Sequence, residues 1–445
     1  MTGEMPSCVR PKEVWVSKCI YSLLQTIVML TILVSTMGHT SELDLDRIIR
    51  EALEQNPGLS KLKHRWAAFE ARVSQAGALM DPNVKFDLVN LPTNSFDLDS
   101  TPMSGRSLWV SQQFPFPGTR SVRERVAKHA SDVAEAKFED RESTIVNAVK
   151  QAYFNLAFLD RAISITRDNE TLLRDLIRIA QTKYAVGRGL QQDVLKAQVT
   201  LSGLKDKLIR LGTIRATTEA RLNLLLNRSL ESEVGRPEKV TLTAMQYTLE
   251  EIQQAALEAR PLLKGLEHSV LKWRATERLA RRQVWPDFTI SLGYRQRAGT
   301  KDDPVNGADF LSIGIGMNLP LYKGRKQHHQ IVEAQANIRM AQSQVEEAKQ
   351  QVLFSTRVAY LEARRHLEEA ELFETAILPQ AEQSLESAMT GYQVDKVDFL
   401  TLLNNQVTLF NFEIDYYRHV TGHEKKLAEL EAAVGRPLFQ TERSW

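Results

Sequence analysis

The sequence predicts a mainly α fold with a small β part, built from two copies of one unit of about 200 residues. The first observation is the repeat itself: residues 45–59 read LDRIIREALEQNPGL, and residues 249–263 read LEEIQQAALEARPLL. The second is a stretch without proline or glycine, residues 119–184, whose apolar residues recur at steps of four and three, as in a long helix that packs along its length. The third is a set of four short stretches that alternate apolar and polar residues with the period of a strand. We therefore expect each copy to be a long helical hairpin joined to a short β-hairpin.

Residues 1–39 have the order of a secretory signal peptide. Arg10, Lys12 and Lys18 precede an apolar run over residues 20–34, and small residues up to Gly38 follow it. The alternative is a retained single-span anchor, for which this run is somewhat short. We therefore expect cleavage near Gly38 and export of the remaining chain.

The composition excludes several function classes. The formal net charge of +2 provides no basic field for nucleic acid. Both cysteines, Cys8 and Cys19, precede the expected cleavage site, so the exported chain would have no disulfide and no cysteine metal site. The sequence contains no Gly-rich phosphate loop, no HExxH and no GxSxG motif, and its carboxylates are scattered over helix faces. We predict that the protein is not an enzyme and uses no cofactor.

The elements follow the same order in both copies. The first repeat is expected over residues 40–240, with its β-hairpin near 83–115, and the second over residues 245–438, with its β-hairpin near 287–319. The elements of the first are helices over 46–55 and 57–78, strands near 84–88 and 108–111, a long helix over 119–184 and a return helix over 191–226. Those of the second are helices over 250–259 and 261–283, strands over 288–294 and 310–318, a long helix over 325–392 and a return helix over 398–434. Residues 439–445 form a C-terminal tail.

The two long helices differ in their apolar seams. In the first copy the seam runs through Ile145 and Val149, and Thr166 and Glu170 interrupt it further on. A helix of about 65 residues is roughly 98 Å long, too long to bury its seam within one small domain. Pro379 lies inside the second long helix and is expected to bend it. The seam of this second copy uses smaller residues, namely Val352, Thr356, Ala359, Ala363, Ala370 and Ile377.

The strand stretches have the length and the alternation of tilted transmembrane strands. Their alternating apolar residues in the second repeat are Ile290, Leu292 and Tyr294 on one strand and Leu311, Ile313, Ile315 and Met317 on the next. Four strands cannot close into a barrel, and an open edge in lipid leaves backbone groups unpaired. Two chains would supply eight strands, and three would supply twelve. The alternative is a pair of soluble β-hairpins packed on helices, and the pattern alone leaves both open.

The duplicated order of elements resembles that of the TolC-like outer membrane efflux proteins, over residues 43–437. The features that carry this resemblance are the strand ending in FPFPGTR, residues 114–120, and the paired turns YAVG, residues 184–187, and YQVD, residues 392–395. Within the family, residues 81–82, 90–103 and 112–118 are most similar to the CzcC-like heavy-metal efflux branch.

The resemblance implies a homotrimer whose duplicated helical hairpins form a trimeric α-barrel, continuous with a 12-stranded transmembrane β-barrel of four strands per chain. This tube would lie in the cell outer membrane, contact its lipid and extend into the periplasm. The implied function is the exit duct of a tripartite RND-type efflux system, which conducts substrate passively, with heavy-metal cations as the candidate cargo. Its partners would be a periplasmic adaptor (membrane fusion) protein and an inner-membrane RND pump. The alternative is an exported periplasmic coiled-coil scaffold or adaptor without a pore.

The resemblance also implies which residues form the periplasmic gate. Tyr392 would be held by a hydrogen bond to Asp193, so that Tyr392→Phe would raise the conductance. Asp193 could equally be a capping or solvated acid in the first turn of its helix. Thr401 and Asn404 occupy positions at which the family carries an acidic ring around the aperture, and Val397 replaces its basic gate partner.

The adaptor would contact the two turns at the tip, which comprise Val186, Gly187, Arg188, Val394, Asp395 and Lys396. Asp395 stands where the family usually has glycine. This departure leaves the backbone of the second turn open, although Asp tolerates the left-handed conformation better than most residues.

No metal site is predicted. His64 and His268 occupy equivalent repeat positions on helices, without a second ligand at a suitable spacing, and are interpreted as packing residues. His328 and His329 lie among basic residues and are interpreted as a charged, solvated helix start. The acidic pair at 302–303 belongs to a polar loop.

Overall fold

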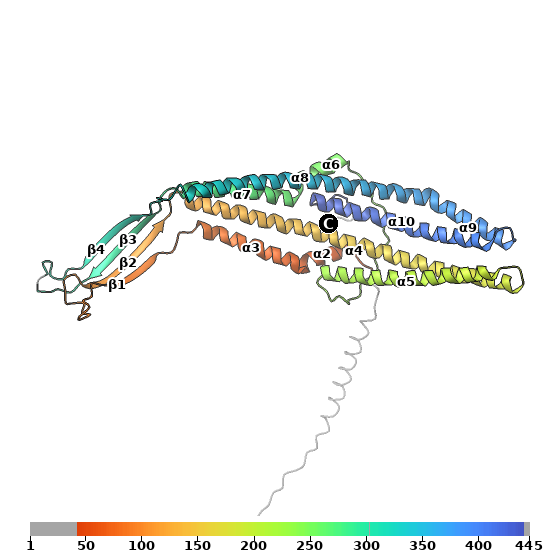
Figure 1. The fold of residues 1–445 in the computed structure, drawn as a ribbon, viewed down its shortest axis with the longest axis horizontal. Helices are drawn as coiled ribbons and strands as arrows, with labels where there is room; N and C mark the ends of the chain where they lie inside the picture. The colour runs from red at the N-terminus through yellow and green to blue at the C-terminus, as the bar shows by residue number, and fades with distance from the viewer. Residues whose placement is uncertain (1–41, 302, 440–445) are drawn as a thin grey trace, which may run out of the picture.

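The computed structural model describes residues 42–301 and 303–439. The molecule is elongated: a four-stranded sheet lies at one end, and long helices run side by side to two hairpin ends at the other (Figure 1). The expected signal peptide, residue 302 of the acidic pair and nearly all of the C-terminal tail lie outside the described residues.

The helices begin and end within a few residues of the positions that the sequence predicts. In the first half they are α2 (Leu45–Gln55), α3 (Pro57–Gly77), α4 (Thr119–Ala185) and α5 (Gln191–Leu225). In the second half they are α6 (Leu249–Ala259), α7 (Pro261–Arg282), α8 (Gln327–Leu372), the π-helix η1 (Phe373–Ile377), α9 (Leu378–Gln393) and α10 (Phe399–Val434). Within the described residues, none of these helices is both long and apolar enough to cross a membrane.

Local sequence explains the starts of the short helices. The Asp44 carboxylate accepts from the first backbone N–H groups of α2. Thr248 and Glu251 form a capping box at the start of α6. Proline occupies the first position of α3 and of α7, where its missing N–H costs no hydrogen bond, as Pro57 and Pro261.

The second long helix passes Pro379 without ending. The five-residue π-helix η1 directly precedes α9, whose second residue is this proline. A π-turn is wider than an α-helical turn and so makes room for the proline ring. It also tolerates the loss of the backbone hydrogen bond that proline, without an N–H, cannot donate. The expected disturbance therefore takes the form of a π-turn, and the helix follows a curved path past it (Figure 1).

The hydrophobic core is divided into separate clusters of buried side chains along the long helices, because the molecule is too thin to enclose one central core. The seam of α4 is buried, with Ile145 and Val149 at most 1 % exposed. Thr166, which interrupts it, is also buried and donates its hydroxyl to the Ala162 carbonyl at 2.6 Å. One cluster, near the hairpin ends, includes Leu173, Leu176, Val194, Tyr392, Phe399 and Leu403.

The strands are β1 (Asn83–Val89), β2 (Gly105–Phe114), β3 (Phe288–Gln296) and β4 (Phe310–Met317). They pair antiparallel in the order β1-β2-β3-β4, so the two hairpins join through β2 and β3 into one sheet. The sheet extends away from the helices (Figure 1), which corrects the alternative of two β-hairpins packed on helices.

The register places most apolar residues of the four strands on one face, while Trp109 and Phe310 lie on the other. Phe86 pairs with Leu108, which pairs with Tyr294, which pairs with Leu311. The face is exposed over residues that include Val84, Phe86, Leu88, Leu108, Val110, Ile290, Leu292, Leu311, Ile313, Ile315 and Met317. The opposite face carries small and polar residues such as Ser107, Ser111, Ser291 and Ser312.

Candidate functional site

The two hairpin ends are built as the same turn. After α4 the Arg188 N–H donates to the Lys183 carbonyl at 2.8 Å, and after α9 the Lys396 N–H donates to the Gly391 carbonyl at 2.9 Å. Gly187 and Asp395 occupy the left-handed position, with φ of 73° and 59°. These are the bonds of a Schellman motif, which satisfies the last carbonyls of a helix. Asp395 therefore adopts the left-handed backbone conformation of the glycine that is usual at this position.

Lys183, at the end of α4, binds to the turn that follows α9. Its Nζ donates to the backbone carbonyl of Tyr392 at 2.7 Å and to Asp395 Oδ1 at 2.5 Å. The same ammonium lies over the Tyr392 ring, 4.1 Å from its centroid. The hydrogen bond and the charge of Lys183, aided by Arg188, hold the pKa of Asp395 below its usual range. One lysine thus joins α4 to the end of α9 by three contacts.

Tyr392 is buried at this joint. Its side chain is 7 % exposed and packs on Phe399, with ring centroids 5.7 Å apart. Burial raises the pKa of the Tyr392 phenol, and the carboxylates of Asp193 and Asp395 raise it further.

The expected Tyr392–Asp193 hydrogen bond is not formed within the part of the chain that the structure describes. Asp193 lies in the first turn of α5 and acts on Tyr392 through its charge alone. The contacts that hold Tyr392 use its backbone carbonyl and the face of its ring, and both are made by Lys183. The residue that joins the two turns is therefore Lys183, in place of Asp193.

The other predicted gate residues lie on the first turns of α10. Thr401 donates its hydroxyl to Asp398 Oδ2 at 3.0 Å, while its backbone N–H donates to Asp398 Oδ1 at 2.7 Å, so Asp398 caps the helix. Asn404 is exposed. Val397 fills the space that a side chain at Gly391 would need, since a Cβ there would lie 2.5 Å from Val397 Cγ2.

The turns expose apolar side chains at their ends. Val186 is 66 % exposed and Val394 is 58 % exposed, and Arg188 and Lys396 beside them are also exposed. The structure therefore brings all six predicted turn residues to the same end of the molecule (Figure 1). Such a pair of apolar tips flanked by basic residues can take a partner of matching shape.

No local pattern in the sequence singles out Lys183. It lies 209 residues from Tyr392 in the chain, and no local pattern pairs the two. Its position directly before the repeated tyrosine was the available signal, since the equivalent position in the second repeat is Gly391. A residue that is present in only one of the two copies can link the two turns, as Lys183 does.

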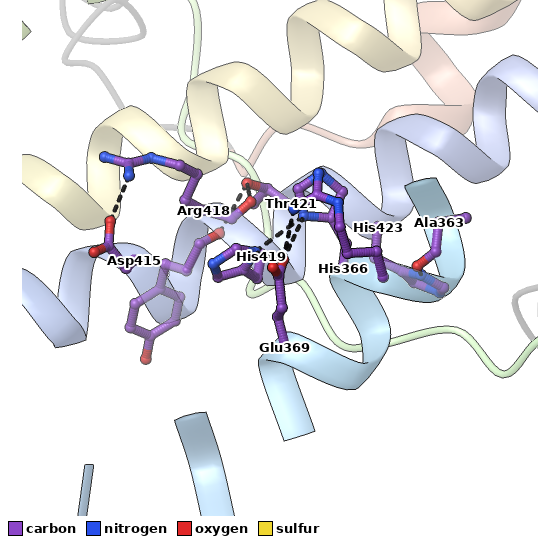
Figure 2. A network of polar contacts seen from close by, with 10 residues as sticks. Ala363, His366, Glu369, Asp415, Arg418, His419, Thr421 and His423 are labelled. Carbon is purple, nitrogen blue, oxygen red and sulfur yellow. Dashed lines mark hydrogen bonds and ion pairs between the residues drawn. The ribbon is translucent and has the colours of Figure 1, made fainter. Parts of the chain in front are cut away.

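A second polar network joins α8 to α10 (Figure 2). His366 Nδ1 lies 3.0 Å from His419 Nδ1, and His419 Nδ1 lies 2.8 Å from a carboxylate oxygen of Glu369. Burial lowers the pKa of His366 to about 4, and the charge of Arg365 and the neighbouring His419 contribute. Gly422 leaves room for the ring, because a Cβ there would lie 2.9 Å from it.

Comparison with known proteins identifies the fold. The family model described as outer membrane efflux protein matches residues 48–228 and 252–436. The cobalt-zinc-cadmium resistance protein CzcC of Cupriavidus metallidurans is 23% identical over 385 residues, 84% of this chain and 85% of that protein. The outer membrane protein TolC of Escherichia coli is 23% identical over 400 residues, 83% of this chain and 77% of that protein. The structure of the outer membrane protein VceC of Vibrio cholerae superposes with a TM-score of 0.74 at 20% identity, over 88% of this chain and 96% of that one.

Proposed function

The chain belongs to the outer membrane efflux protein family, and we propose that three copies of it assemble into one continuous duct. The protein is an outer membrane efflux channel with a periplasmic extension, and it is not an enzyme. The alternative of a poreless periplasmic scaffold is not favoured. The two repeats, residues 40–240 and 245–438, would each supply one β-hairpin and one helical hairpin to the wall of the duct.

The observation that carries the assembly is the open sheet with its exposed apolar face. Ile313 and Ile315 are 73 % and 75 % exposed, and within the described residues β1 and β4 each leave one edge unpaired in the four-stranded order. A strand edge and an apolar face are both satisfied when sheets from several chains close into a barrel in lipid. Three chains supply twelve strands, with the polar face turned to the lumen.

The helices offer matching faces for neighbouring chains. Phe354, Val358 and Leu361 recur on α8 at steps of four and three and are exposed in the single chain. This is the spacing of a helix seam that packs against another helix. Contacts between copies would bury it along the periplasmic barrel.

The hairpin ends would form the periplasmic gate, with Lys183 holding each chain's two turns together. Swinging α9 and α10 away from α4 breaks the bonds from Lys183 to Tyr392 and Asp395. The exposed turns, residues 186–188 and 394–396, would receive a periplasmic adaptor that connects to an inner-membrane RND pump. Energy would come from that pump, and the duct would conduct passively.

The cargo would be heavy-metal cations. The support is the similarity to a protein named for cobalt, zinc and cadmium resistance, which covers 84% of this chain. A duct conducts what its pump delivers, so a cation cargo would require no binding site in the wall.

The assembly is tested by the native mass of the protein after detergent extraction from outer membranes. The expected result is three times the mass of one chain. A monomer recovered from the soluble periplasmic extract would refute the duct.

A charge on the apolar face tests the orientation of the sheet. Ile313→Lys puts an ammonium near the middle of β4, which costs about 2–4 kcal/mol on a lipid face at the bilayer midplane, so little trimer should reach the outer membrane. Ser312→Lys is the matched control, because residue 312 lies on the opposite face. Equal amounts of trimer from both variants would contradict the proposed lipid face.

A further inference from the structure

The geometry points to a divalent-cation site that joins α4 to α7, with His129, Asp132 and His268 as its ligands. His129 and Asp132 lie one turn apart on α4, and His268 comes from α7. One ligand atom from each lies within 4.8 Å of the other two. This site does not depend on the proposed duct and adds a binding site to the wall of the helical region.

One nitrogen of each imidazole, Nδ1, lacks a hydrogen-bond partner. His129 Nδ1 and His268 Nδ1 are both buried, and neither makes a hydrogen bond. Both nevertheless face the same carboxylate oxygen, Asp132 Oδ2, at 3.5 Å and 3.2 Å. Buried polar atoms are normally paired, so two unpaired nitrogens around one oxygen call for an explanation.

A cation between the three atoms supplies that partner. Bonds of about 2.0–2.1 Å from a tetrahedral Zn²⁺ ion place neighbouring ligand atoms about 3.3 Å apart. The observed separations of 3.2 Å and 3.5 Å bracket this value. Each neutral imidazole would carry its proton on Nε2 and turn the Nδ1 lone pair to the ion.

The carboxylate is already oriented for this role. Lys128 Nζ binds Asp132 Oδ1 at 2.9 Å, which leaves Oδ2 for the ion. The side chain of Asp132 is 12% exposed, so its position is well defined by its surroundings. Partners of this kind orient metal ligands and strengthen the site.

A close approach of the two helices brings the ligands together. Gly265 lies one turn before His268 on α7, and a Cβ at this position would lie 2.9 Å from the Cβ of Ala136 on α4. The glycine therefore lets the helix backbones approach beside the site. An imidazole can then reach across to a short aspartate.

The donor set selects the class of cation. Two imidazole nitrogens and one carboxylate oxygen suit Zn²⁺ and neighbouring first-row ions, whereas Mg²⁺ and Ca²⁺ prefer oxygen ligands. The side chains of His129 and His268 are 24% and 38% exposed, so an ion can enter and a water molecule can complete its coordination. The bound ion would fasten the first repeat to the second.

The second histidine cluster, His366, Glu369 and His419, is less suited to a cation. Arg365 Nη1 donates to Glu369 Oε2 at 2.7 Å, and Arg365 Nη2 lies 3.3 Å from His366 Nε2. The guanidinium thus occupies Oε2, the same carboxylate oxygen that faces His419 and that a cation would need, whereas Lys128 leaves Asp132 Oδ2 open. His366 and His419 serve instead as controls.

Co²⁺ titration of the purified full-length protein, stripped with EDTA and dialysed, tests the site. We expect the visible d–d absorption of tetrahedral Co²⁺ to saturate at one equivalent per chain, and Zn²⁺ to abolish it. Zn²⁺ should also raise the unfolding temperature, because only the folded chain gathers the three ligands and so binds the ion more tightly than the unfolded chain. His268→Ala and Asp132→Asn should each weaken binding at least about 10- to 100-fold, the loss that removal of even a supporting partner causes.

His64→Ala is the matched control, since His64 occupies the equivalent repeat position on α3 and is exposed. This variant and His366→Ala should keep the wild-type titration. The proposal is overturned if the wild-type protein gives no saturable spectrum, or if His366→Ala loses the spectrum while His268→Ala keeps it. Unfolding temperatures measured without metal show whether a variant that fails to bind is still folded.

Discussion

Replacing Lys183 by methionine should open the hairpin ends. The substitution keeps the length and much of the apolar stem of the side chain but removes the ammonium that contacts Tyr392 and Asp395. In the proposed gate this ammonium makes the closing contact, so the variant should lose the main polar bond between α4 and α9.

The magnitude follows from the buried part of the contact. A hydrogen bond from a charged donor contributes about 1.5–3 kcal/mol, and a cation over an aromatic ring contributes about 0.5–1 kcal/mol near the surface. The side chain of Lys183 is 19% exposed, so partial rehydration reduces the sum to about 2 kcal/mol. The exposed Asp395 carboxylate adds little that solvent does not screen. A change of about 2 kcal/mol shifts the ratio of open to closed ends about 30-fold.

Single-channel conductance of the purified protein in planar bilayers measures this shift. Lys183→Met should spend far more time in high-conductance states than the wild type. Lys196→Met is the control, because Lys196 is exposed near the same end, on α5, and takes part in no ion pair among the described residues.

Tyr392→Phe distinguishes a gate held by a Tyr392–Asp193 hydrogen bond from one held by Lys183. The hydroxyl of Tyr392 makes no hydrogen bond to Asp193 among the described residues, while the ring and the backbone carbonyl that Lys183 contacts are kept in phenylalanine. We therefore expect wild-type conductance from this variant. The reasoning is refuted if Lys183→Met conducts like the wild type, or if Tyr392→Phe opens the channel and Lys183→Met does not.

Two further predictions concern stability. The pKa of His366 is lowered to about 4 in the folded state, so the unfolded chain binds a proton at a higher pH than the folded chain does. The contribution of the neutral His366 to the free energy of unfolding is therefore fully present above pH about 6.5 and is lost as the pH falls towards 4. Unfolding temperatures measured across this window should fall more for the wild type than for His366→Gln, and parallel curves would contradict the assignment. Gly187→Ala forces a Cβ into the left-handed conformation at φ 73° and should destabilise the first turn by about 1–2 kcal/mol. Faster amide exchange at residues 183–190, with no change at 391–398, is the expected readout, and unchanged exchange would argue against the strain.

The sequence alone determines the elements of this protein, because their signals are local. Caps and prolines mark the helix starts at residues 44–45, 57 and 261, and the seam through Ile145 and Val149 has the period of a packed helix. Alternation marks the four strands and shows which residues of each strand form its apolar face. Family resemblance extends this to the duct, since the repeat and the paired turns are both visible in the chain.

Only the tertiary structure decides which distant side chains meet. Lys183 contacts a turn 209 residues away, and His268 lies beside a carboxylate on a helix of the other repeat. These pairings depend on the axial stagger of packed helices, set by contacts such as Gly265 against Ala136, where a shift of one turn moves every side chain by about 5.4 Å. The local period of apolar residues shows which face of a helix is buried. It is the same for every axial stagger of two helices, so it does not determine which side chain on the neighbouring helix each residue contacts.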